Sequence, residues 1–266
     1  MNNPARFQHY RQGRWEAAAS AVIGEAPVAL TVNGAVWLTF MCTPTHLEAQ
    51  AVGFLFNEGV IDSRAEVADV RPCATGENVD VWLHRAVTRP THWTRTSGCT
   101  GGATQTAARH YPPIIDTVRL SPEQVSGLIT QLLEAQDLHR ETGGVHASAL
   151  SDGERLLLVT EDIGRHNTLD KIAGRCLLEG VDPRGKILLT TGRVSSEMLG
   201  KAARLRASAI ISRTSPTSLS VQIAEDAGVT LIGYARRDRF TVYAHPERLL
   251  SPQELTNVAE NFSPAH

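Results

Sequence analysis

Cysteine is scarce in this chain, and its four copies stand far apart in the 266 residues. Cys42, Cys73, Cys99 and Cys176 form no C-x-x-C pair. That spacing excludes both a dense disulfide framework and a zinc knuckle, so we expect no zinc and no other bound metal. Reduced thiols in a reducing compartment are the simplest interpretation.

Long apolar runs and a strong excess of one charge are also missing. No apolar run is long enough to cross a bilayer, and the N-terminal Met1–Phe7 segment lacks the apolar core of a signal peptide. The formal net charge of −2 disfavours a general nucleic-acid binder. The 42% hydrophobic and 20% charged fractions are typical of a soluble globular protein. We therefore expect a cytoplasmic protein with neither membrane nor nucleic acid as a partner.

Residues 1–110 predict a smaller N-terminal α+β lobe. Residues 29–32 and 35–40 flank Asn33-Gly34, a pair that favours the type I′ turn of a β-hairpin. Thr45 and Glu48 predict a capping box that opens a helix, and Gly59 ends that helix. Residues 79–84 alternate as a half-buried strand does.

Residues 111–266 alternate between predicted helices and strands. A Ser121–Gln124 capping box opens a helix that we expect to run to Thr142–Gly144. Four strands are predicted, at residues 155–160, 186–190, 209–211 and 229–234, with a helix in each interval. Strands joined by crossover helices predict an α/β domain with a mainly parallel sheet and helices on both faces. Cys176 falls on the apolar stripe of one helix, which indicates a structural role.

Cys99 stands in a different setting, the glycine-flanked segment Thr96–Gly102. Glycines leave the sulfur uncovered and allow positive φ, so backbone N–H groups can converge on a thiolate. A buried, inert cysteine is the alternative, because most free cysteines behave as small hydrophobes.

Polar runs follow each predicted strand of the second domain. Ligands of such sheets bind beyond the carboxyl ends of the strands, where helix N-termini and arginine forks favour phosphate. The pattern therefore predicts an anionic, phosphate-bearing ligand. Alternatively, some of the arginines only form loop ion pairs with Glu161, Asp162 or Glu197. The runs are residues 161–171, 191–197, 212–217 and 235–240.

The same runs resemble the FdhD/NarQ family, the formate dehydrogenase accessory sulfurtransferases, from about Pro27 to Arg248. The most specific block is Glu161-Asp162-Ile163-Gly164-Arg165-His166-Asn167. The others, in chain order, are Thr142–Ala147, Asp170-Lys171, Gly192-Arg193, Glu197-Met198, Ser215–Thr217 and Leu231–Arg236.

The resemblance implies a fold and a function. The larger domain would have the cytidine deaminase fold. The protein, a homodimer, would take sulfur from a cysteine desulfurase and pass it to the molybdenum cofactor, bis-molybdopterin guanine dinucleotide, before the cofactor enters formate dehydrogenase. Cys99 would carry the sulfur as a persulfide. Many family members have C-x-x-C at this point, whereas here the second position is Gly102, which favours a relay by one cysteine.

The resemblance also implies a cofactor site near the last strand, with GDP or GMP as fragment ligands. Its residues would be Tyr234, Ala235, Arg236, Arg237, Asp238, Arg239, Arg165, Gly192 and Arg193. His146 and His166 would lower the pKa of Cys99 if either lay close to it, or would simply be hydrogen-bonded within the fold.

Three other functions are weighed against this one. A zinc deaminase needs H-x-E and P-C-x-x-C, but His146-Ala147-Ser148 lacks the glutamate and the chain has no P-C-x-x-C. A cysteine hydrolase would use Cys99 with His146 or His166 on an acyl substrate. A non-enzymatic chaperone would deliver the cofactor without needing Cys99.

Overall fold

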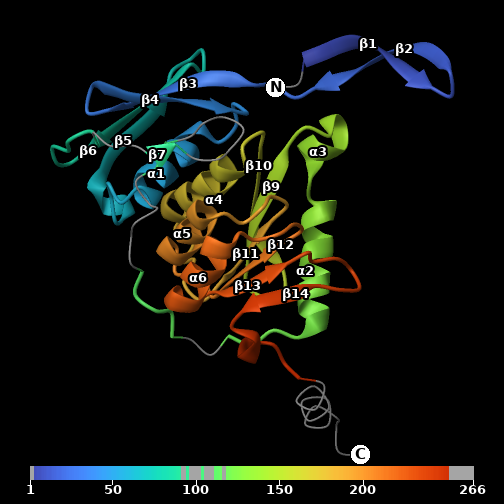
Figure 1. Cartoon of the computed structure of the whole chain (residues 1–266). Helices are drawn as coiled ribbons and strands as arrows, with labels where there is room; N and C mark the ends of the chain where they lie inside the picture. The colour runs from blue at the N-terminus through green and yellow to red at the C-terminus, as the bar shows by residue number, and fades with distance from the viewer. Residues whose placement is uncertain (1–2, 91–93, 96–102, 105–110, 116–117, 252–266) are drawn as a thin grey trace, which may run out of the picture. The chain divides into compact units, whose positions relative to one another are not determined.

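The structure is a computed structural model that describes residues 3–90, 94–95, 103–104, 111–115 and 118–251 (Figure 1). Cys99 and Gly102 lie outside the described residues. The chain divides into two compact units. The first holds residues 1–108, 134–148 and 159–182, and the second holds residues 109–133, 149–158 and 183–266. The units thus interleave along the sequence, while a border between folding domains near residue 110 stays a prediction.

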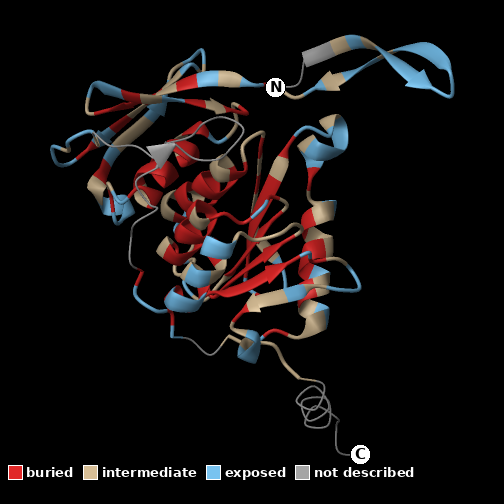
Figure 2. Ribbon diagram, viewed as in Figure 1, coloured by how far each residue is buried: buried red, intermediate tan, exposed pale blue. Residues whose placement is uncertain are grey.

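The chain begins with a two-stranded antiparallel ribbon. β1 (Asn3–Arg11) and β2 (Arg14–Val22) pair with each other, and Gln12 and Gly13 make the turn with φ of 47° and 83°. The ribbon forms a sheet of its own, and most of its residues are exposed (Figure 2). The sequence motifs did not predict this separate element.

A four-stranded sheet in the order β4-β3-β6-β5 forms the core of the first unit. The predicted hairpin is confirmed: β3 (Ala26–Val32) and β4 (Ala35–Cys42) flank Asn33 and Gly34, whose φ values are 49° and 82°. β5 (Val67–Pro72) and β6 (Asn78–Leu83) complete the sheet. α1 (Leu47–Asn57) packs on the buried face, where Trp37, Leu30 and Leu55 are almost fully buried. A 3₁₀ turn (Arg64–Glu66) and the short strands β7 (Thr94–Arg95) and β8 (Ala103–Thr104) are also described.

Two glycines allow α1 to lie very close to α4 (Arg165–Glu179). A Cβ atom at Gly53 would overlap the carbonyl oxygen of Asp170, and one at Gly174 would overlap that of Ala49. The two backbones therefore touch directly. At the end of α1, the buried Asn57 amide donates to Asp170 Oδ1 (2.7 Å), which joins the helices further.

The second sheet has six strands in the order β10-β9-β11-β12-β13-β14. β11 (Ile187–Thr190), β12 (Ala209–Ser212) and β13 (Thr230–Gly233) are parallel and buried along their whole length (Figure 2). Burial on both faces explains their continuous apolar sequences. α5 (Ser196–Arg204) contacts β12, and α6 (Ser218–Ala227) contacts β13. β14 (Thr241–Ala244) is antiparallel to β13, and a 3₁₀ turn (Pro246–Arg248) follows it.

Some local predictions are confirmed and others need correction. The Ser121–Gln124 capping box is present: the Ser121 amide donates to Gln124 Oε1 (2.9 Å) and the Gln124 amide to Ser121 Oγ (3.2 Å). The helix it opens does not reach Thr142, however. α2 (Pro122–Glu134) ends first, and α3 (Asp137–Thr142) follows and stops at Gly143, whose φ is 69°.

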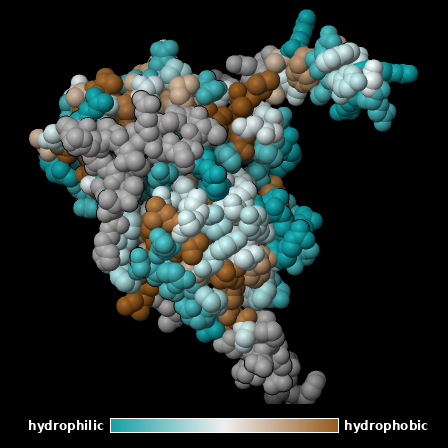
Figure 3. All heavy atoms as spheres, viewed as in Figure 1, coloured by the Kyte–Doolittle hydropathy of each residue, from teal (hydrophilic) through white to brown (hydrophobic). Residues whose placement is uncertain are grey.

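The start of α1 is also corrected. His46, in the left-handed region, is its N-cap, and Thr45 instead accepts a hydrogen bond from Lys171 (3.3 Å). β9 (His146–Ser151) and β14 were not predicted, whereas β10 (Leu156–Asp162) was. None of the described helices is long and apolar enough to span a bilayer. Among the coloured residues of the face in Figure 3, hydrophilic and hydrophobic side chains are interspersed.

Candidate functional site

Three parallel strands end side by side in the second unit. Thr190 at the end of β11 pairs with Ser212 at the end of β12, and Ile211 pairs with Ile232 of β13. Hydrogen bonds join the loops that follow: the Ser212 hydroxyl donates to the Gly192 carbonyl (2.7 Å), and the Ala235 amide donates to the Ser212 carbonyl (2.9 Å). The polar runs after these strands therefore share one edge of the sheet, where ligands of such sheets bind.

Two arginines hold positive charge together at this edge. Arg236 Nη1 donates to the carbonyl oxygens of Arg213 (2.5 Å) and Ala235 (2.8 Å). Burial first, and the charge of Arg236 second, lower the pKa of Arg213. The Nε of Arg213 is buried and has no hydrogen-bond partner among the described residues. Because a buried donor and a like-charged neighbour both cost free energy, an anion bound here would relieve both.

The remaining predicted residues of this edge differ in exposure. Gly192 and Ala235 are buried, whereas Arg193, Arg237, Asp238 and Arg239 are exposed. Arg239 Nη1 lies 3.9 Å from Asp238 Oδ2 with both side chains about three-quarters exposed, so this ion pair contributes little to stability. Tyr234 has a φ of 50° and is 48% exposed. Arg165, the last of the predicted cofactor-binding residues, belongs to the first compact unit, whereas the others belong to the second.

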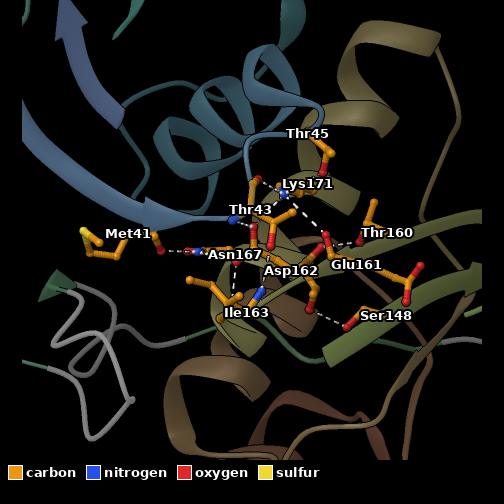
Figure 4. Close-up of polar contacts among 12 residues, drawn as sticks. Met41, Thr43, Thr45, Ser148, Thr160, Glu161, Asp162, Ile163, Asn167 and Lys171 are labelled. Carbon is orange, nitrogen blue, oxygen red and sulfur yellow. Dashed lines mark hydrogen bonds and ion pairs between the residues drawn. The ribbon is translucent and has the colours of Figure 1, made fainter. Parts of the chain in front are cut away.

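In the first unit, the Glu161–Asn167 motif contributes to a network of hydrogen bonds around Asp162 (Figure 4). Asp162 Oδ2 accepts from Lys171 Nζ (2.6 Å) and from the Thr43 amide (3.0 Å), while its Oδ1 accepts from the Gly164 amide and Asn167 Nδ2, both at 2.8 Å. Lys171 and Asp162 are fully buried. The ammonium also donates to the Thr43 carbonyl (2.9 Å). The pair thus fastens the β4–α1 loop to the start of α4.

Glu161, Asp162 and Glu197, the acids considered as partners of arginines, have other partners among the described contacts. Asp162 pairs with Lys171 instead. Both Glu161 oxygens accept backbone amides at the start of α3, those of Leu138 (2.8 Å) and His139 (2.9 Å). Glu197 Oε2 accepts from the Ser195 hydroxyl (3.0 Å).

In the first unit, a hydrogen bond joins β9, which holds His146, to the start of α4, which holds Arg165. The hydroxyls of Ser148 and Thr168 share a 2.7 Å hydrogen bond, and Thr168 Oγ1 donates to the Arg165 carbonyl (2.7 Å). His146 is two residues before Ser148 in β9, so it lies on the same face of the strand. Burial, then the charges of Arg165 and His166, lower the pKa of His146, which favours the neutral imidazole. A role for either histidine in lowering the pKa of Cys99 stays a prediction.

The three described cysteines have different environments. Burial is the largest cause that raises the pKa of both Cys42 and Cys176 to about 12, and the prediction that Cys176 is structural agrees with its 3% exposure. Cys73 differs: the Thr75 hydroxyl (3.2 Å from the sulfur) and the Asn78 amide (3.2 Å) lower the pKa of its thiol. Cys73 is therefore the most readily ionised thiol in the described ranges, and it becomes the natural control for Cys99.

Sequence reasoning missed two features of these sites. It placed Arg213 only within a polar run, because the contact with Arg236 depends on sheet order. It also missed Thr43 as a partner of Asp162, because 119 residues separate them. No group of three or more His, Cys, Asp or Glu side chains is placed to hold a metal ion in the described part of the chain.

The comparisons with known proteins identify the family. Residues 23–250 match the model of the FdhD/NarQ family. The chain belongs to this family. The match includes the Glu161–Asn167 motif, the loops at the sheet edge and the segment that contains Cys99.

Curated relatives of the FdhD/NarQ family cover nearly the whole chain. The sulfur carrier protein FdhD of Bacillus subtilis (strain 168) is 36% identical over 247 residues, which is 90% of this chain and 94% of the relative. The protein of the same name from Staphylococcus aureus (strain MRSA252) is 34% identical over 252 residues, with 92% and 95% covered.

A solved structure shares the fold. A crystal structure described as a formate dehydrogenase accessory protein, from Desulfotalea psychrophila, superposes with a TM-score of 0.82 at 30% identity. The superposed region covers 94% of this chain and 99% of the chain in the crystal structure. The prediction of a mixed α/β fold is thereby confirmed.

Proposed function

We propose that this protein is a sulfur carrier that serves formate dehydrogenase. Cys99 accepts sulfur as a persulfide from a cysteine desulfurase. It then passes that sulfur to a molybdenum cofactor, bis-molybdopterin guanine dinucleotide, before the cofactor enters the dehydrogenase. Two relatives named sulfur carrier protein FdhD and the accessory protein of similar structure support this assignment.

The Arg213–Arg236 pair carries the cofactor half of the proposal. Two guanidinium groups at the ends of parallel strands, one with a buried donor that has no partner in the described part of the chain, suit a diphosphate. The cofactor is cargo in this scheme, and its guanine nucleotide arms carry the phosphates. Arg193, Arg237 and Arg239 are exposed and add positive charge around the same edge.

The sulfur half is ordinary thiol–persulfide exchange. The Cys99 thiolate attacks the terminal sulfur of the desulfurase persulfide, a new S–S bond forms, and the desulfurase cysteine leaves as a thiolate. In the second step, an electron pair of the acceptor attacks the terminal sulfur, and Cys99 leaves as a thiolate. Neither step needs a second cysteine at position 102, where the chain has glycine.

Loading of Cys99 tests the sulfur half. We expect the intact chain, incubated with a cysteine desulfurase and cysteine, to gain the mass of one sulfur atom that a reductant removes. Cys99→Ala should lose this gain, whereas Cys73→Ser should keep it, although Cys73 has the lowered pKa. Persistent loading of Cys99→Ala, or none in the wild type, would contradict the proposal, and loading lost only in Cys73→Ser would move it to the other thiol.

Binding of GDP tests the cofactor half separately. Titration calorimetry should show saturable binding of GDP, with the dissociation constant at least tenfold higher in Arg213→Gln or Arg236→Gln. Tenfold corresponds to about 1.4 kcal/mol, close to the lower end of the roughly 1.5–3 kcal/mol that a hydrogen bond to a charged group contributes. Arg155→Gln is the matched control, because Arg155 is an exposed arginine beside Asp152. Equal affinity in all four proteins would remove the site from this edge.

A further inference from the structure

A groove of about 670 Å³ lies in the second unit. It is lined by residues of the segment that follows Pro112, by the end of α6 and by the 3₁₀ turn Pro246–Arg248. Arg248 holds these parts together, because its guanidinium donates to the carbonyl oxygens of Ile114 (2.9 Å), Ser208 (2.9 Å) and Gly228 (2.7 Å). The groove is therefore built into the fold of this unit.

Three apolar residues that line the groove are open to solvent. Ile115 is 93% exposed, more than any other large apolar side chain of the described residues. Pro113 is exposed as well, and Val118 is half-buried. A single exposed apolar residue needs no explanation, whereas several that line one hollow are typical of a binding surface. The groove therefore has the character of a docking site.

Charged groups of both signs line the rest of the groove. The carboxylates are those of Glu225, Asp226 and Glu247, and the guanidinium groups are those of Arg119 and Arg248. His245 also lines it, and its Nδ1 lies 2.8 Å from a Glu247 carboxylate oxygen. Because the two signs nearly balance, the charge favours neither a strongly basic nor a strongly acidic occupant. The apolar residues decide what fits.

The described part of the chain ends beside this groove. The Leu120 amide donates to the Arg248 carbonyl (2.9 Å), and the Leu250 amide donates to the Leu120 carbonyl (2.9 Å). Both Arg248 and Arg119, the neighbour of Leu120, line the groove. Ser251 is the last described residue, and the family match ends at residue 250. Residues 252–266 thus begin at the border of the groove and lie beyond the region that matches the family.

The sequence of this last segment predicts an amphipathic helix. Residues 251–254, Ser-Pro-Gln-Glu, repeat the type of cap signature that begins α2 at residues 121–124. Leu255, Val258 and Phe262 follow at spacings of three and four residues, so a helix would carry them on one face. A helix this short is marginal in water by itself and needs a surface on which to bury its apolar face.

We propose that residues 252–266 of the same chain bind in this groove, with their apolar residues against Ile115 and Val118. Covalent attachment favours this occupant, because a segment tethered at the border of its site has an effective concentration in the millimolar range. A separate partner would have to bind more tightly than that to displace it. The segment shields Ile115 from water, which explains why the fold leaves this side chain uncovered by the residues up to Ser251.

Hydrogen–deuterium exchange of the full chain, read by mass spectrometry over residues 252–262, tests the proposal. We expect these amides to exchange at least tenfold faster in Ile115→Asp than in the wild type. Because Ile115 is 93% exposed, the substitution leaves the described fold intact. Val36→Asp is the matched control, since Val36 is an exposed β-branched residue of the four-stranded sheet, and it should leave this exchange unchanged. Equal exchange in Ile115→Asp and the wild type would overturn the proposal.

A double-mutant cycle tests the contact from its other side. Phe262→Ser should speed the exchange as Ile115→Asp does, and the double variant should exchange no faster than the faster single variant, because both remove one interaction. Additive effects would place the segment elsewhere and reject the groove. The protection should also stay constant from about 1 to 50 µM protein, as expected for binding within one chain. Protection that grows with concentration would assign the occupant to another copy and contradict the proposal.

Discussion

We expect Lys171→Met to lower the free energy of unfolding by about 3–5 kcal/mol, a range seen when one partner of a buried ion pair is removed. The ammonium of Lys171 and the carboxylate of Asp162 are both fully buried and lie 2.6 Å apart. Methionine fills a similar volume but leaves the Asp162 charge uncompensated. The carboxylate then keeps only its hydrogen bonds from neutral donors, those of Thr43, Gly164 and Asn167.

Urea unfolding followed by circular dichroism measures this loss. Lys186→Met is the control, since Lys186 is a half-buried lysine outside this network, and it should change stability by no more than about 1 kcal/mol. A Lys171→Met/Asp162→Asn chain should lose less than the sum of the two single changes, because both remove the same interaction. A Lys171→Met chain as stable as the control would show that the pair does not fasten the β4–α1 loop.

The second large effect is expected at the crossing of α1 and α4, where Gly174→Ala should cost about 3 kcal/mol or more. The added methyl group would meet the backbone carbonyl of Ala49, which cannot move without shifting all of α1. Gly53 makes the reciprocal contact with the carbonyl of Asp170. Overpacking against backbone is more costly than overpacking against a flexible side chain.

The control variant for this prediction is expected to change the stability in the opposite direction. Gly127 lies inside α2, and a Cβ atom placed there meets nothing within 4 Å. Gly127→Ala should therefore raise stability by about 0.5–1 kcal/mol through helix propensity alone. Thermal and urea unfolding of both variants should separate them clearly. Two changes of the same sign would mean that helix propensity, and not the crossing, decides the outcome at Gly174.

Local signals predicted most of the regular structure well. The Asn33-Gly34 turn and the Ser121–Gln124 capping box depend only on residues adjacent in the chain, and both are present. Boundaries were less certain where a helix can stop without a strong signal. Gln136 breaks the predicted long helix before α3, and no glycine or proline marks that point in the sequence.

The sequence singled out the Glu161–Asn167 motif but did not predict the structural role of Asp162. The motif lies within the residues that match the family, and a polar loop after a strand favours ligand binding. In the fold, Asp162 instead receives Lys171 and the amide of Thr43. Nothing in a linear pattern distinguishes a carboxylate that meets a ligand from one that meets a lysine of the next helix.

The amino-acid sequence was sufficient to predict the family, the alternation of helices and strands, the lack of closely spaced cysteine pairs and the arginines at the strand ends. These depend on composition, local hydrogen bonding and periodicity, which neighbouring residues set. Which charged side chains meet, in contrast, became known from the folded chain. Folding buries Lys171 against Asp162 and places Arg236 against Arg213. The physical reason is that Coulomb interactions and burial depend on distance in space, and strand order and register set that distance.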